Sequence, residues 1–202
     1  MMILSKKGVV GMSSEMQIAV IGIIGTLGGT VLGWLLNNLS QKGKLNIYLS
    51  RWTDEFQYND NTGCMVPSSS MEQTECYGYK VSFDLYNSSR ETKIMRNIHI
   101  KFINNKQVLY DEVPKDDYTK RVSHPMVYYD DVTIVNVPAK SAMKLNLHGG
   151  LWRDKKSDKD NLEFIIKTNK IQLEYTDEKN KSQKVIIKKY DYKECFLNRS
   201  EE

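Results

Sequence analysis

Apolar and polar residues follow two different patterns along this chain, and the change between them lies near residue 42. Between Glu15 and Lys42 no residue is charged, and the segment 17–36 is almost entirely apolar. A helix of about 20 apolar residues, rising about 1.5 Å per residue, covers the bilayer hydrocarbon core of about 30 Å. The pattern predicts a tail (1–16), one transmembrane helix (17–36) and a linker (37–43).

From residue 44 to residue 196 apolar and polar residues alternate in short runs, and a C-terminal tail (197–202) follows. A period of two gives each strand of a β-sheet one buried face. The sequence therefore predicts a mainly β fold, an antiparallel β-sandwich of about eight strands, with a barrel as the alternative. The apolar positions of the runs are Leu45, Ile47, Leu49; Tyr79, Val81, Phe83, Leu85; Ile94, Ile98, Ile100, Phe102; Val132, Ile134; Met143, Leu145, Leu147; Leu162, Phe164, Ile166; Ile171, Leu173, Tyr175; and Val185, Ile187.

Two long segments between these runs, 51–75 and 104–131, show no such alternation and are expected to be irregular. Loops longer than about 12–15 residues are usually functional or disordered. The second segment is rich in tyrosine, which interfaces favour because its large ring ends in a polar group. Its tyrosines either cover a sheet edge, which is the commoner role, or form a partner surface with neighbouring acids. The residues of that candidate surface are Tyr118, Tyr128, Tyr129, Asp130 and Asp131.

Glycines recur along the apolar segment at Gly22, Gly25, Gly29 and Gly33, a spacing that places them on one helix face. The last three form two overlapping G-x-x-x-G steps, which allow helix backbones to pack closely in a membrane. The pattern predicts self-association of the anchor or docking to another helix. The alternative is that glycine is simply commoner in membrane helices.

The charge distribution bears on orientation and on partners. The net charge is +4, but 29 basic and 25 acidic residues are interspersed, which is not the basic stripe of a nucleic-acid-binding protein. Residues 1–11 are interpreted as translated leader sequence, with the true start at Met12. Lys42 and Lys44 would then retain the β-domain in the cytoplasm by the positive-inside rule. A cleaved signal peptide with an exported domain is the alternative.

Motifs for catalysis or metal binding are absent from the sequence, so no enzyme activity, cofactor or metal is expected. The three cysteines have no metal-ligand spacing, although Cys64 and Cys76 could pair in an oxidising compartment. His148 precedes Gly149-Gly150, which predicts a turn. The acidic pairs Asp116-Asp117 and Asp130-Asp131 are typical of solvated turns.

Three segments carry a resemblance to known proteins: 83–87 (FDLYN), 94–100 (IMRNIHI) and 171–177 (IQLEYTD). They resemble a group of small prokaryotic single-pass membrane proteins with an immunoglobulin-like β-sandwich and no assigned activity. The resemblance implies a membrane-tethered, non-enzymatic interaction module that recruits a protein partner. A weaker resemblance is to membrane-anchored, β-strand-rich antiphage effectors. It implies the alternative function, a bacterial defence effector whose β-domain binds a nucleotide second messenger.

Overall fold

The computed structural model describes residues 13–41, 43–156 and 160–197, and the chain divides into two compact units, with the boundary between residues 42 and 43. The first unit contains helix α1 (Ser14–Gln41). Within the described residues, this is the one helix long and apolar enough to cross a membrane, over Ser14–Leu39. Its described side chains up to Leu39 are all exposed.

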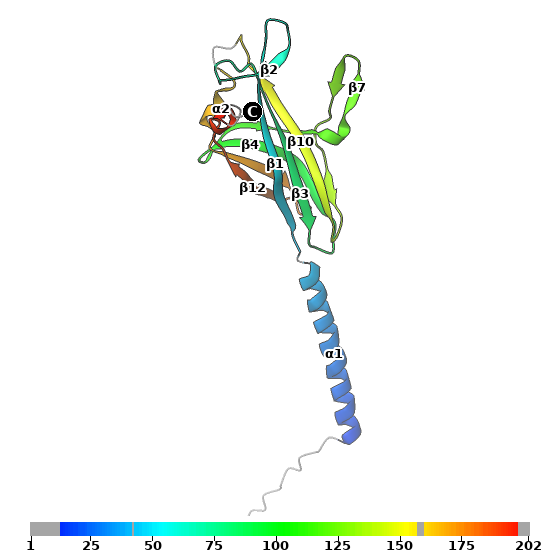
Figure 1. Cartoon of the computed structure of the whole chain (residues 1–202). Helices are drawn as coiled ribbons and strands as arrows, with labels where there is room; N and C mark the ends of the chain where they lie inside the picture. The colour runs from blue at the N-terminus through cyan, green and yellow to red at the C-terminus, as the bar shows by residue number, and fades with distance from the viewer. Residues whose placement is uncertain (1–12, 42, 157–159, 198–202) are drawn as a thin grey trace, which may run out of the picture. The chain divides into compact units, whose positions relative to one another are not determined.

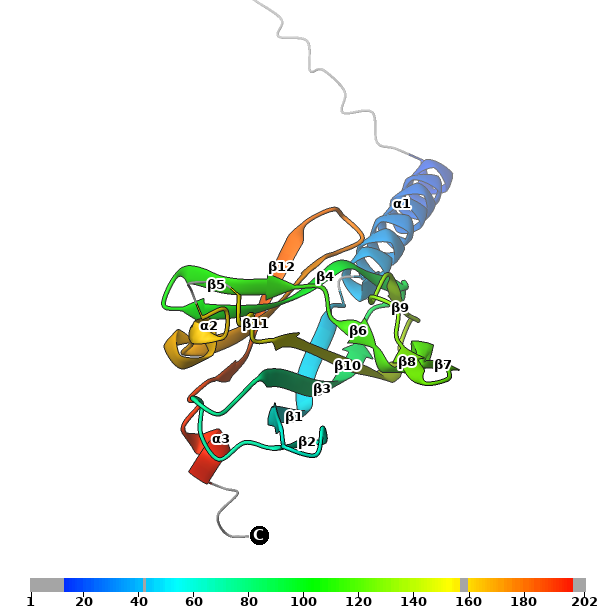
Figure 2. The same ribbon diagram turned by 90° about the horizontal axis from the view of Figure 1, so that it is seen from above.

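The second unit is a sandwich-like pair of antiparallel sheets, and no sheet closes into a barrel within the described residues (Figures 1 and 2). The predicted fold class is therefore confirmed. The first sheet has the order β2 (Met65–Pro67), β1 (Leu45–Asn59), β3 (Cys76–Asn87), β10 (Ala142–Trp152), β6 (Lys115–Asp116). The second has the order β12 (Ser182–Lys189), β11 (Lys170–Thr176), β4 (Lys93–Asn104), β5 (Gln107–Glu112), with β9 (Val135–Val137) paired to β4. Strands β7 (Arg121–Ser123) and β8 (Met126–Tyr128) form a separate ribbon.

The core lies between the two sheets and follows the alternation in the sequence. On β3, every second residue from Tyr77 to Leu85 is almost completely buried, and the residues between them face outward. Phe102 on β4 stands against this row, with its ring 5.8 Å from Tyr79 and 6.0 Å from Tyr77. Aromatic rings in edge-on packing therefore fill the centre of the sandwich.

Strand β1 is longer than predicted, because a bulge hides its second half from the alternation. The register against β3 shifts between Leu49 and Arg51. Before the shift odd-numbered residues such as Ile47 face the core, and after it even-numbered ones such as Trp52 and Phe56 do. A bulge adds one residue to one strand and so changes which face its side chains take. The expectation that 51–75 is irregular is wrong for its first nine residues, which belong to β1.

Two other expectations also differ from the structure. The run around Leu162, Phe164 and Ile166 is the short helix α2 (Glu163–Lys167), in which adjacent Phe164 and Ile165 are both buried. The segment 104–131 holds strands β5 to β8 and the 3-10 helix η1 (Asp117–Thr119). The described residues thus form twelve strands, not about eight, because several strands have only two or three residues and no apolar face.

At one end of the sandwich, a buried Asn87 joins the loops after β3 and β9. Its side chain is completely buried, and its amide nitrogen lies 2.8, 2.9 and 3.0 Å from the carbonyl oxygens of Glu91, Val137 and Pro138. Its amide oxygen accepts from the backbone nitrogen and the hydroxyl of Ser89 at 2.9 and 2.6 Å. The polar groups of these loops are thereby satisfied inside the fold.

Candidate functional site

The tyrosine-rich segment leaves the first sheet after β6 and forms a projecting ribbon, which we call the β7–β8 arm (Arg121–Tyr128; Figures 1 and 2). All six strand residues of the arm are exposed. Val122 has 64% of its surface accessible and Met126 has 58%. The arm therefore presents apolar side chains to solvent, which marks an interaction surface when such side chains are contiguous.

The acidic residues predicted for the surface hold the base of the arm in place. Asp130 forms an ion pair with Arg121, and Asp131 forms one with Lys115 at 2.6 Å. The backbone nitrogen of Asp130 donates to the hydroxyl of Thr119 at 2.8 Å. Because these carboxylates are already paired, the exposed surface of the arm is apolar and aromatic and carries no free negative charge.

The three predicted tyrosines occupy different positions around this base. Tyr118 is the most exposed, at 69%, and its hydroxyl accepts a hydrogen bond from the Asn146 amide at 3.2 Å. Tyr128 lies on the arm, half-exposed. Tyr129 is partly buried and packs edge-on against the ring of His148, with centroids 4.3 Å apart. The structure thus brings all five predicted residues into one region, in which Tyr118 and Tyr128 are exposed and the exposed Asp130 and Asp131 are engaged in ion pairs.

Beside Tyr118, a groove of about 310 Å³ lies on the outer face of the first sheet. We call it the Arg51 groove, and it is lined by Arg51, Thr53, Lys80, Ser82 and Asp117, among others. Lys80 is paired with Glu55 at 2.6 Å. The side chains of Arg51, Thr53 and Ser82 form no hydrogen bond or ion pair within the described part of the chain. The groove therefore offers a free guanidinium and two free hydroxyls.

Sequence reasoning missed the residues that join the groove to the arm. His148 lies opposite Lys80 on the neighbouring strand, and its Nδ1 is hydrogen-bonded to a carboxylate oxygen of Asp117 in η1. The expected turn after His148 is wrong, because Gly149 and Gly150 lie inside β10. Two consecutive glycines inside a strand pattern are themselves a signal for a close approach.

The close approach is made by Glu112, whose carboxylate lies where a Cβ of Gly149 would stand. The hydroxyls of Tyr79 and Tyr110 donate to the two carboxylate oxygens of Glu112 at 2.6 and 2.8 Å. Burial raises the pKa of the Glu112 carboxyl above its ordinary value, although both tyrosine hydrogen bonds oppose that shift. This group packs against β10 at Gly149, the residue after His148.

A second buried carboxylate, Asp54, holds the C-terminal helix α3 (Glu194–Leu197) against the first sheet. It accepts from the hydroxyl of Tyr77 at 2.8 Å and from the thiol of Cys195 at 3.4 Å. Burial, with the Asp54 charge, raises the pKa of Cys195 to about 12. A thiol that stays protonated is a poor nucleophile, so this cluster fits a structural role.

Three other sequence expectations can be placed on the structure. All three cysteines are free, so the Cys64–Cys76 bridge is not formed. Among the described residues, no group of three or more histidine, cysteine or acidic side chains could hold a metal ion. On α1, a Cβ added at Gly22, Gly25, Gly29 or Gly33 would meet nothing within 4 Å, so this face is open for packing.

Comparison with known proteins identifies the family of the second unit, which we call the β-unit. The sequence model described as the YopI Ig-like domain matches residues 43–188. The chain belongs to the YopI Ig-like domain family. A relative from Bacillus subtilis strain 168 is the uncharacterised SPbeta prophage-derived protein YopI. It is 27% identical to this chain over 169 residues, which cover 82% of this chain and 92% of that protein. The predicted immunoglobulin-like character is therefore confirmed.

Two solved structures show only a distant likeness to this YopI-family chain. A Bordetella pertussis protein assigned as ApaA has 10% identity and a TM-score of 0.35, with 73% of this chain and 91% of that chain covered. The Iho670 flagellar-like filament has 9% identity and a TM-score of 0.34, with 87% and 98% covered. Scores this low carry no argument about fold or function.

Proposed function

We propose that this chain is a membrane-tethered, non-enzymatic interaction module, with helix α1 as its single transmembrane anchor and the β7–β8 arm as the surface that recruits a protein partner. The β-unit is proposed to be cytoplasmic. The observation that carries the proposal is the arm, which projects from the first sheet with every strand residue exposed.

The arm is suited to partner binding by its edges as well as by its side chains. A two-stranded ribbon leaves backbone groups of both outer edges unpaired, which is a template for adding a strand from another chain. The long edge strand β12 differs from the arm, because it carries three lysines, Lys184, Lys188 and Lys189. Edge lysines disfavour strand addition, so a partner strand is directed to the arm.

Site-specific photocrosslinking of the full chain in membranes of cells that carry its gene tests this proposal. A photoreactive residue at Val127 is expected to give a discrete protein adduct. The matched control carries the same residue at Ile186, which is exposed on β12, and is expected to give none. Val122→Ser with Met126→Ser should remove the Val127 adduct. Identical patterns from both positions would refute the arm as the recruiting surface.

The anchor itself is proposed to associate with a second copy of the chain through the glycine face. Replacing Gly25, Gly29 and Gly33 by isoleucine would separate the helix backbones without reducing the apolar character needed for insertion. Crosslinking of the full chain is therefore expected to yield a homo-oligomer that the triple variant loses. Equal crosslinking of both proteins would show that the glycines do not mediate association.

A second candidate function, recognition of a nucleotide second messenger, is favoured by the Arg51 groove. A free guanidinium can bind phosphate in a bidentate manner, and Tyr118 stands beside the groove with a ring on which a base could stack. Thermal-shift measurements with cyclic dinucleotides on wild type and Arg51→Ala test this function. A shift seen only with Arg51 present would support it, and no shift in either protein would reject it.

A further inference from the structure

The Arg51 groove contains one positive charge that the described part of the chain leaves unpaired. The guanidinium of Arg51 forms no hydrogen bond or ion pair there, although the other charged groups of the lining are engaged. Lys80 pairs with Glu55 at 2.6 Å, and a carboxylate oxygen of Asp117 is hydrogen-bonded to Nδ1 of His148. The groove thus offers a ligand one cation whose hydrogen-bonding groups are all available.

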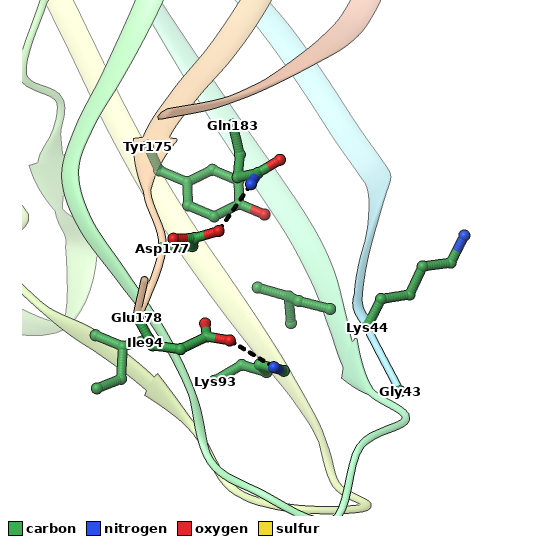
Figure 3. A pocket seen from close by; sticks show the side chains of 9 residues that line it. Gly43, Lys44, Lys93, Ile94, Tyr175, Asp177, Glu178 and Gln183 are labelled. Atoms are coloured by element: carbon green, nitrogen blue, oxygen red, sulfur yellow. Dashed lines mark hydrogen bonds and ion pairs between the residues drawn. The ribbon is translucent and has the colours of Figure 1, made fainter. Parts of the chain in front are cut away.

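A second pocket of the β-unit, shown in Figure 3, lacks such a charge. It has a volume of about 240 Å³ and lies between the start of β1, the start of β4 and the hairpin that joins β11 to β12. Glu178 pairs with Lys93 at 2.5 Å, and Asp177 accepts from the Gln183 side chain at 2.7 Å. The side chain of Lys44 is directed away from this pocket in Figure 3. The groove on the first sheet is therefore the better candidate for a charged ligand.

Two hydroxyls stand beside the guanidinium of Arg51. Ser82 lies directly opposite Arg51 on β3, and Thr53 follows two residues further along the same face of β1. Directly paired residues have Cβ atoms about 4.5–5.5 Å apart, and the next residue on the same face is about 7 Å away. A small group held by Arg51 is therefore within reach of both hydroxyls. A carboxylate has about four lone-pair sites, so it can accept a bidentate guanidinium and both hydroxyls together.

A row of residues across the first sheet connects Arg51 with the β7–β8 arm. The register places Arg51 opposite Ser82, and Ser82 opposite Asn146 of β10. The Asn146 amide donates to the hydroxyl of Tyr118 at 3.2 Å, and Tyr118 belongs to η1, which leads into the arm. Neighbouring strands are about 4.8 Å apart, so Arg51 and Asn146 are separated by about 10 Å. The groove and the base of the arm therefore belong to one continuous surface.

The charges of the groove favour a carboxylate over the phosphates of a nucleotide. A carboxylate carries one negative charge, which matches the single unpaired cation. A cyclic dinucleotide carries two phosphates, so one of them would lack a cation in a groove that also contains the carboxylates of Glu55 and Asp117. Like charges placed side by side at an interface oppose binding. The groove is therefore suited to a ligand group with one negative charge.

We propose that the protein partner of the β7–β8 arm places an aspartate or glutamate side chain in the Arg51 groove. The Arg51 guanidinium pairs with this carboxylate, and the hydroxyls of Thr53 and Ser82 donate to it. Apolar residues of the same partner segment contact Tyr118 and the arm. An extended segment advances about 3.3 Å per residue, so the acidic residue lies about three residues from the one at Tyr118. The inference rests on the proposed recruiting function of the arm and names the chemistry of the segment that it binds.

Photocrosslinking of the full chain in membranes of cells that carry its gene tests the inference. A photoreactive phenylalanine analogue at Tyr118 keeps an aromatic ring at this exposed position and is expected to form an adduct with the partner. Mass spectrometry of the adduct should find an aspartate or glutamate about three residues from the attached residue. With the partner below saturation, Arg51→Ala should lower the adduct yield about tenfold or more, because charge-assisted hydrogen bonds to the carboxylate are lost.

Arg90→Ala is the matched control for the loss of an arginine. Arg90 is exposed in the loop after β3 and likewise has no ion pair among the described residues, so its removal should leave the yield unchanged. Arg51→Glu should abolish the adduct, and replacing the identified acidic residue of the partner by lysine should restore it. A general loss of folding could not be reversed in this way. Equal yields in wild type and Arg51→Ala, or an attached segment without an acidic residue, would overturn the inference.

Two further measurements separate this inference from the proposals on which it bears. Excess cyclic di-GMP should not reduce the Tyr118 adduct; a reduction that requires Arg51 would overturn the carboxylate assignment in favour of a nucleotide. The adduct formed from Val127 reports on the arm itself. If Val127 gives no adduct, the recruiting function fails. If Val127 gives an adduct of equal yield in wild type and Arg51→Ala, only the present inference fails.

Discussion

Asn87 provides the sharpest test of how the end of the sandwich is held together. Its amide nitrogen has two hydrogens to share among three carbonyl groups, and its oxygen accepts two further hydrogen bonds. Asn87→Ala thus removes four hydrogen bonds at a completely buried position. At about 0.5–1.5 kcal/mol each, the expected loss in the free energy of unfolding is roughly 4 kcal/mol.

The assay is urea unfolding of residues 43–202, which form a compact unit with their own core, followed by tryptophan fluorescence. On heating, a loss of that size should lower the thermal unfolding midpoint by about 8–16 °C for a domain of this size. Asn46→Ala is the matched control, because its exposed amide makes a single long hydrogen bond, 3.5 Å, to the carbonyl oxygen of Tyr86. Asn87→Asp keeps the shape but replaces the donor by an oxygen facing three carbonyl groups. A loss below about 1 kcal/mol for Asn87→Ala, or a stable Asn87→Asp, would refute the reasoning.

Three further predictions concern single groups. Gly149→Ala should lose about 1–3 kcal/mol of unfolding free energy, because its Cβ would overlap Glu112, whereas at Gly78 a Cβ meets nothing nearer than 3.6 Å and the same change should cost less than about 1 kcal/mol. Burial raises the pKa of folded Glu112 above its ordinary 4.5, so its stabilising effect is complete below that pH and is lost as pH rises through the folded pKa. Urea midpoints measured from pH 4.5 upward should show this loss in wild type and not in Glu112→Gln, and equal pH slopes would contradict it. Iodoacetamide should label exposed Cys64 rapidly and Cys195 slowly, because burial raises the pKa of the Cys195 thiol to about 12; peptide mass spectrometry over time measures both.

The fold could be predicted where strands are long and have one buried face. The runs around Tyr79, Ile98, Leu145 and Leu173 lie in strands, because alternation follows directly from which side of a paired strand meets the core. Prediction from alternation failed at the bulge after Leu49, where one added residue reverses the pattern of buried and exposed positions. It also failed in α2, where helical geometry buries two adjacent residues that a strand would place on opposite faces.

The candidate surface could be predicted only in part. Tyr118 and Tyr128 stand out in the sequence because they lie in a long segment rich in tyrosine and acids. Arg51, Asn146 and His148 do not, because they come together only through the pairing of β1, β3 and β10. His148 meets Asp117 from 31 positions away. Register between distant strands decides such meetings, and no local pattern encodes it.

Strand β1 also has a mechanical consequence. Residues 42–44 separate it from helix α1, the proposed anchor, and it is paired with β3 over twelve positions, from Leu45 to Gln57. Its hydrogen bonds run perpendicular to the strand. A partner bound to the β7–β8 arm would hold the first sheet near β6. Strand β6 pairs with β10 at His148, which lies opposite Lys80 of β3, and Lys80 lies opposite Thr53 of β1. A pull between the proposed anchor and such a partner would load β1 along its axis, so that its hydrogen bonds to β3 would resist together in shear and would not break one after another.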